Sequence, residues 1–69
     1  MERSPVSSSN IRSVGYDSES SILEVEFNNG SVYQYVGVPR AEFDGLMSAA
    51  SPGTYINENI KRRYSYAKL

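Results

Sequence analysis

The chain carries a segment near its C-terminus in which positive charge alternates with aromatic rings. The run from residue 61 to residue 68 reads Lys-Arg-Arg-Tyr-Ser-Tyr-Ala-Lys and holds Lys61, Arg62, Arg63, Tyr64 and Tyr66. Basic side chains neutralise phosphates and aromatic rings stack on unpaired bases, so the combination is typical of surfaces that bind single-stranded nucleic acid. The alternative is structural, because the helix dipole favours Lys and Arg in a last turn and a cluster this small is commonly solvated.

A second candidate is the pair Tyr33 and Tyr35, whose spacing places both rings on one face of a strand. Several RNA-binding folds stack unpaired bases on aromatic rings at a sheet surface. Strands also favour aromatic residues, so both rings could instead pack in the core or against Leu23 and Val25. Both interpretations stay open on the sequence alone.

Residue types that perform catalysis or bind metals are sparse. The chain has no cysteine and no histidine, so it lacks a thiolate nucleophile and the usual zinc ligands. The acidic pairs Glu24/Glu26 and Glu42/Asp44 fit a solvated strand face and the N-terminal end of a helix. No serine has a candidate base, and no phosphate-binding glycine loop is present. We therefore expect a non-catalytic protein with no cofactor and no metal site.

Length and charge limit the class of protein further. The chain has 69 residues, enough for one domain, and a net charge of −1. Only one basic residue, Arg40, lies between Tyr16 and Glu58, whereas every charged residue after Glu58 is basic. The first residues contain no signal-peptide apolar region, and a membrane span would need roughly 20 apolar residues. We expect a cytoplasmic protein without a membrane partner.

A small sheet must position these side chains. Residues 1–9 are polar and serine-rich, so we expect a flexible segment there and a single domain over residues 10–69. Apolar alternation predicts an antiparallel three-stranded meander with strands at Ile11–Asp17, Ile22–Asn28 and Ser31–Val36. In the first of these strands, Val14 and Tyr16 are expected on one face and Ile11 on the other.

Two short helices are expected to follow the meander and to pack on one face of the sheet, which makes the fold class α+β. The first runs from Pro39 to about Ala50 and is expected to cover the sheet with Phe43, Leu46 and Met47. The second is expected from about residue 52 to residue 62, with Ser-Pro-Gly-Thr at its start.

The turn between the second and third strands decides which way the tyrosines point, because a shift of one residue moves every side chain to the opposite face. A two-residue Asn29-Gly30 turn would pair Glu26 with Tyr33 and place the tyrosines beside the glutamates. A three-residue loop at 28–30, with Gly30 left-handed, would pair Val25 with Tyr33 and turn the tyrosines toward the core. The sequence is compatible with both turns.

An ordered set of short motifs spans most of the chain, roughly from residue 11 to residue 66. They are Leu23-x-Val25-x-Phe27, Gly30, Tyr33-x-Tyr35, Val38-Pro39, Ala50-Ser51-x-Gly53 and Arg63-Tyr64-x-Tyr66. At these spacings the set resembles the KTSC domain. The resemblance implies a small bacterial module, also found at the C-terminus of some lysyl-tRNA synthetases, for which RNA binding is suspected.

Two hypotheses of function follow from the residues and the resemblance. In the first, the domain binds single-stranded RNA or tRNA through its basic and aromatic candidates: Tyr33, Tyr35, Lys61, Arg62, Arg63, Tyr64 and Tyr66. In the second, it is a protein–protein interaction module without a nucleic-acid role, and it docks a partner through an exposed sheet face or an open strand edge.

Overall fold

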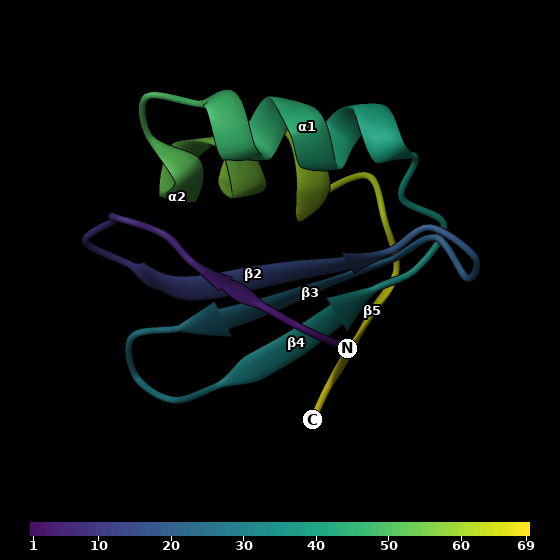
Figure 1. Ribbon diagram of the computed structural model, residues 1–69, viewed down its shortest axis with the longest axis horizontal. Helices are drawn as coiled ribbons and strands as arrows, with labels where there is room; N and C mark the ends of the chain where they lie inside the picture. The colour runs from purple at the N-terminus through teal and green to yellow at the C-terminus, as the bar shows by residue number, and fades with distance from the viewer.

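The computed structural model describes residues 1–69 as an antiparallel sheet with helices packed over one of its faces (Figure 1). The strands lie side by side in chain order: β1 (Ser4–Pro5), β2 (Ile11–Asp17), β3 (Ile22–Phe27), β4 (Val32–Tyr35) and β5 (Tyr66–Lys68). The helices are α1 (Arg40–Ser48), α2 (Pro52–Tyr55) and the π-helix η1 (Ile56–Ile60). The α+β class is confirmed, but the sheet has five strands and not the predicted three. None of the helices has the length together with the apolar composition that a membrane-spanning helix requires.

The N-terminal segment, which composition predicted to be flexible, contains the first extra strand. In β1, Ser4 lies opposite Val14 and Pro5 opposite Ser13, and just beyond it the Val6 N–H donates to the carbonyl oxygen of Arg12 at 3.1 Å. Preceding residues cross the sheet face opposite the helices (Figure 1), so close to Gly15 that a β carbon there would collide with the backbone of residue 2. A glycine on β2 is therefore required for this crossing.

The three-residue loop is the one that joins β3 to β4. The Phe27 N–H donates to the carbonyl oxygen of Ser31 at 2.8 Å, and Gly30 has a φ of 91°. Val25 consequently lies opposite Tyr33, and both tyrosines of β4 face the helices. The glutamates of β3 face the other way.

A β-bulge between Ile11 and Ser13 changes the predicted facing of β2. Ile11 pairs with Phe27, but Ser13 pairs with Glu26, so one residue of β2 has no partner on β3. The extra residue reverses the alternation. Ile11 therefore joins Val14 in the core, and the prediction that it faces the other side was wrong.

The helix α1 covers the sheet with a narrower apolar stripe than the sequence predicted. Leu46 is fully buried, with 0% of its surface exposed, and Phe43 stacks on Tyr16 with ring centroids 5.4 Å apart. Met47 is 40% exposed, so its predicted place in the core was wrong. Met47 follows Leu46 directly in the sequence, so its side chain points in a different direction from the helix axis. The buried Val38, just before the helix, contributes to the core instead.

The second helical segment begins as predicted and ends earlier. The Ser51 hydroxyl accepts a hydrogen bond from the Thr54 N–H at 3.4 Å, which caps the helix at its start. At its end the Lys61 N–H donates to the carbonyl oxygen of Ile56 at 2.8 Å, a π-type bond spanning five residues. Ile56 and Ile60 are both buried. The segment thus ends at Ile60, and residues 61–63 form a turn.

Substitution of neighbouring residues on α1 tests this packing. Leu46→Ala should lower the free energy of unfolding by roughly 2–5 kcal/mol, because it leaves a cavity in the core. Met47→Ala, on the exposed side of the same helix, should change it by only about 0.5 kcal/mol or less. Urea unfolding followed by circular dichroism measures both values. An equal loss of unfolding free energy in the two variants would contradict the observed burial of Leu46 and exposure of Met47 on α1.

Candidate functional site

A groove of about 290 Å³ lies between η1 and the β4–β5 side of the sheet. Tyr66 lies opposite Tyr35 across the β4–β5 pair, so its side chain is on the helix-facing side of the sheet. The groove combines aromatic side chains with amides and one cation, and its lining consists of Phe27, Asn29, Ser31, Tyr33, Tyr35, Ile56, Asn57, Lys61 and Tyr66. The arrangement offers an apolar wall and polar groups at one place on the surface.

The aromatic rings of the groove form one cluster centred on Tyr33. Its ring centroid lies 5.6 Å from that of Phe27, 6.4 Å from that of Tyr35 and 5.4 Å from that of Tyr66. Tyr35 is only 2% exposed, and burial raises the pKa of its hydroxyl. Tyr66, in contrast, is 56% exposed. The buried rings therefore support the outer one, and Tyr66 is the ring most accessible to a ligand.

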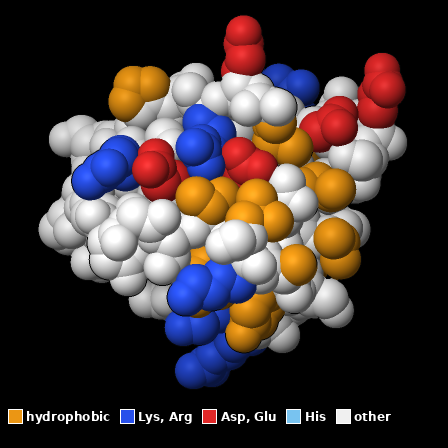
Figure 2. Space-filling model, turned by 90° about the horizontal axis from the view of Figure 1, so that it is seen from below, with side chains coloured by type: hydrophobic (Ala, Val, Ile, Leu, Met, Phe, Trp, Pro, Cys, Tyr) orange, Lys and Arg blue, Asp and Glu red, His pale blue; other side chains and the backbone are white.

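The positive charges without an acidic partner gather around this groove. Of the seven Lys and Arg residues, four pair with a carboxylate within 4 Å, and the three that do not are Lys61, Arg62 and Lys68. Lys61 lines the groove, and the Lys68 ammonium lies 6.0 Å from the centroid of the Tyr33 ring. Arg62 lines an adjoining shallow hollow together with Asn57, Lys61 and Tyr66. Figure 2 shows basic side chains without acidic neighbours at one edge of the molecule.

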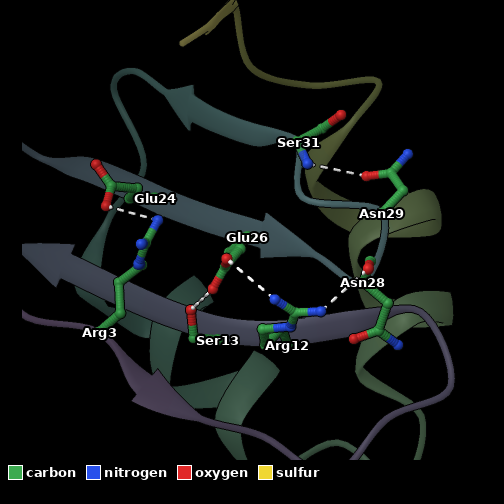
Figure 3. A network of polar contacts seen from close by, with 8 residues as sticks. All are labelled: Arg3, Arg12, Ser13, Glu24, Glu26, Asn28, Asn29 and Ser31. Atoms are coloured by element: carbon green, nitrogen blue, oxygen red, sulfur yellow. Dashed lines mark hydrogen bonds and ion pairs between the residues drawn. The ribbon is translucent and has the colours of Figure 1, made fainter.

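The glutamates of β3 lie on the opposite face of the sheet, where each is paired with an arginine (Figure 3). Glu24 is 8% exposed; one of its oxygens accepts a hydrogen bond from the Gln34 amide at 2.8 Å, and the other lies 3.2 Å from the Arg3 guanidinium. Glu26 accepts a bond from the Ser13 hydroxyl at 2.9 Å and pairs with Arg12. Figure 2 shows the resulting mixture of signs on this face. The glutamates consequently add no repulsion beside the tyrosines.

A second polar cluster, centred on Glu42, fastens the segment after η1 to α1. Its carboxylate accepts hydrogen bonds from the Tyr55 hydroxyl at 2.6 Å and the Tyr64 hydroxyl at 3.1 Å, and the Arg63 guanidinium lies 3.9 Å away. Hydrogen bonding to Glu42 raises the pKa of Tyr55, while desolvation and then the same carboxylate raise the pKa of Tyr64. Two of the predicted site residues, Arg63 and Tyr64, therefore contact a carboxylate away from the groove.

The sequence model that describes the KTSC domain matches residues 7–64. The chain belongs to the KTSC family. A crystal structure of a KTSC domain protein from Yersinia pestis aligns with a TM-score of 0.93 at 42% identity, over 99% of this chain and 96% of that one. An uncharacterized protein from Stutzerimonas stutzeri is 41% identical over 70 residues, which covers 100% of this chain and 99% of the relative.

Part of a much longer protein is also similar to this KTSC domain. A lysine–tRNA ligase from Nostoc punctiforme is 34% identical over 59 residues, which is 86% of this chain but 10% of the ligase. A ligase from Trichormus variabilis is 38% identical over the same length. The family that the sequence motifs indicated is thereby confirmed, including its relation to lysyl-tRNA synthetases.

The fold of the KTSC domain brings together some of the predicted site residues and separates others. Tyr33, Tyr35, Lys61 and Tyr66 line the groove, and Arg62 lies beside it. Sequence reasoning missed the remaining polar lining, notably Asn29 from the β3–β4 loop and Asn57 from η1. These two residues are 28 positions apart, and neither lies in a motif with a chemical signature. Lys68 belonged to the basic run and could have been included.

The hydrogen bonds from tyrosine hydroxyls to the Glu42 carboxylate predict that stability depends on pH in a measurable way. Tyr55→Phe should lower the free energy of unfolding at pH 7 by about 1 kcal/mol, because Glu42 loses a hydrogen-bond donor in a partly exposed site. The raised pKa of Tyr55 means that this contribution is complete below the ordinary tyrosine value of about 10 and disappears as pH rises through the raised value. The difference between wild type and variant should therefore shrink above about pH 10.

Urea unfolding at a series of pH values measures that difference. Tyr66→Phe is the matched control, because no hydrogen bond of the Tyr66 hydroxyl occurs in the structure, and it should leave stability unchanged. A difference for Tyr55→Phe that stays constant from neutral to strongly alkaline pH would contradict the assignment.

Proposed function

We propose that this KTSC domain is a non-catalytic module that binds single-stranded RNA in the groove between η1 and β5. One observation carries the proposal: the three cations without a carboxylate partner lie beside aromatic rings of the groove. Lys61 and Arg62 line one hollow with the exposed Tyr66, and the Lys68 ammonium lies 6.0 Å from the centroid of the Tyr33 ring, which packs against Tyr66. This combination matches the two needs of a single strand, which are neutralisation of its phosphates and a surface on which an unpaired base can stack.

Each part of the groove has a role in this proposal. Tyr66 stacks on a base, a contact worth ~1–3 kcal/mol per base in proteins that bind single strands. Tyr33 holds the Tyr66 ring from behind, at a centroid distance of 5.4 Å. Lys61, Arg62 and Lys68 contact the phosphates on either side. Because the groove is small, it accommodates a short stretch of one strand and leaves duplex RNA outside.

The relatives support RNA as the polymer, and transfer RNA as a class of target. The lysine–tRNA ligase from Nostoc punctiforme contains a region similar to 86% of this chain. A shared domain that contacts an unpaired segment of tRNA would serve such a ligase as an accessory binding surface. In this chain, the same chemistry would act on single-stranded RNA.

A second candidate function is protein binding through the edge of the sheet. The strand β5 pairs with β4 on one side only, and an unpaired strand edge can add a strand from a partner. The exposed sheet face, by contrast, is covered by paired charges and by the N-terminal segment. The three unpaired cations beside β5 favour an anionic polymer, so RNA is the function we propose.

Charge removal tests the electrostatic part of the proposal. Fluorescence anisotropy with a labelled mixed-sequence RNA of about 12 nucleotides should show binding at low salt that weakens as salt rises. Lys61→Gln should reduce the slope of log affinity against log salt by ~0.7, the value for one phosphate contact on a single strand. Arg40→Gln removes the same charge from α1, away from the groove, and should leave the slope unchanged. Absence of binding at low salt would overturn the proposal.

Removal of the exposed ring tests the stacking part. Tyr66→Ala should weaken RNA binding by roughly 5- to 150-fold, the factor that corresponds to ~1–3 kcal/mol of stacking, without altering the salt slope. Met47→Ala removes another exposed apolar side chain, on α1, and serves as the control. If both variants bind RNA as tightly as the wild type, Tyr66 is not a stacking surface.

A further inference from the structure

The loop between β3 and β4 presents a hydrogen-bond donor of fixed orientation at the groove. The Ser31 N–H donates to the Asn29 side-chain oxygen at 2.9 Å (Figure 3). A backbone N–H can only donate, so the atom of the Asn29 amide that accepts this hydrogen bond is its oxygen. That oxygen is therefore engaged within the loop. The amide nitrogen of Asn29, with two N–H groups, remains without a protein partner, and Asn29 lines the groove.

The opposite side of the groove also presents a group that can only donate. Lys61 follows η1, lines the groove and has no carboxylate within 4 Å. Its ammonium carries three donors and no acceptor, so a donor remains for a base while another contacts a phosphate. The remaining polar groups of the lining, such as the Asn57 amide and the hydroxyls of Ser31 and the tyrosines, can both donate and accept. They can pair with any base, so discrimination depends on Asn29 and Lys61.

We infer that the groove prefers a base with a ring carbonyl oxygen at its edge, uracil or guanine, over adenine. This inference rests on the proposed function and names the ligand of the same groove. Guanine O6 and uracil O4 are acceptors, which the donors of Asn29 and Lys61 satisfy. Adenine has an amino group in the corresponding position. Two donors then face each other at that position, and adenine keeps only its ring nitrogens, such as N7, as acceptors. A donor that meets the amino group and is shielded from water without an acceptor costs affinity.

The amino group of adenine and the carbonyl of hypoxanthine allow a matched comparison. The two bases share the purine ring system and differ in the group at C6. We would prepare RNA strands of about ten residues that carry a single adenine or a single hypoxanthine among abasic residues, and a third strand without any base. Self-pairing between bases is thereby avoided, and the phosphate charge is nearly the same in all three strands.

Anisotropy at low salt should give roughly three- to tenfold tighter binding of the hypoxanthine strand than of the adenine strand, the factor expected for one hydrogen bond. Equal affinities for the two strands would overturn the inference. The inference would also be overturned if both strands bound only as tightly as the abasic strand while mixed-sequence RNA bound well. The groove would then make no contact that depends on a base. No binding of any RNA, mixed sequence included, would overturn the proposed function itself.

The substitution Asn29→Asp assigns the preference to the loop. Aspartate keeps an oxygen for the Ser31 N–H and replaces the amide nitrogen with a second acceptor, so the loop should keep its conformation, which circular dichroism and the melting temperature check. The added negative charge should weaken the binding of both RNA strands by the same factor. The ratio of the two affinities should therefore fall from its wild-type value toward one or below. An unchanged ratio would show that Asn29 does not contact the base, against the inference.

Discussion

The pairing register of β3 and β4 is the constraint on which the rest of this KTSC domain depends. Gly30, with a φ of 91°, allows a three-residue loop in which Val25 lies opposite Tyr33. That register places the apolar side chains of β3 and the tyrosines of β4 on one face and the glutamates on the other. With a two-residue turn, the tyrosines would lie beside the glutamates, and the aromatic cluster would have no core behind it. The groove therefore depends on one glycine.

Charge is sorted between the two faces of the sheet as a consequence. On the outer face, Arg3 and Arg12 each pair with a glutamate of β3, so that face carries little net charge. On the helix side, Glu42 attracts Arg63 and two tyrosine hydroxyls. Arg40 pairs with Asp44 on α1. The cations that remain, Lys61, Arg62 and Lys68, are concentrated beside β5. A chain with a net charge of −1 can therefore have a locally positive surface, which the net charge alone does not predict.

The sequence predicted those parts of the fold that have a long periodic pattern. The alternation of β3, the helix after Pro39 and the Ser51 cap all follow from local preferences. The strands β1 and β5 have two and three residues, too few for any alternation to be recognised. The bulge in β2 and the π-turn at η1 each shift side chains by one position, which periodicity cannot anticipate. The bulge in β2 accounts for the wrong facing of Ile11.

For the site, sequence reasoning identified residue types and could not identify their neighbours. Lys61 and Tyr66 were found because charge and aromatic rings alternate near the end of the chain. Tyr33 was found because its spacing from Tyr35 places both rings on one face of a strand. The roles of Arg63 and Tyr64 depend on Glu42, whose bond to Tyr64 spans 22 positions. Such pairs have no local signature, because only packing of the helices brings them together. The same holds for Asn29 and Asn57.

One wall of the groove is the three-residue strand β5, which pairs with the sheet along a single edge. A strand this short is among the first parts of a domain to open, well before global unfolding. A ligand that occupies the groove and contacts Tyr66 must then also stabilise the pairing of β5 with β4. By reciprocity, pairing of β5 must strengthen ligand binding by the same factor by which the ligand strengthens the pairing. Affinity at this surface is thus coupled to the local stability of the last few residues, independently of the stability of the core.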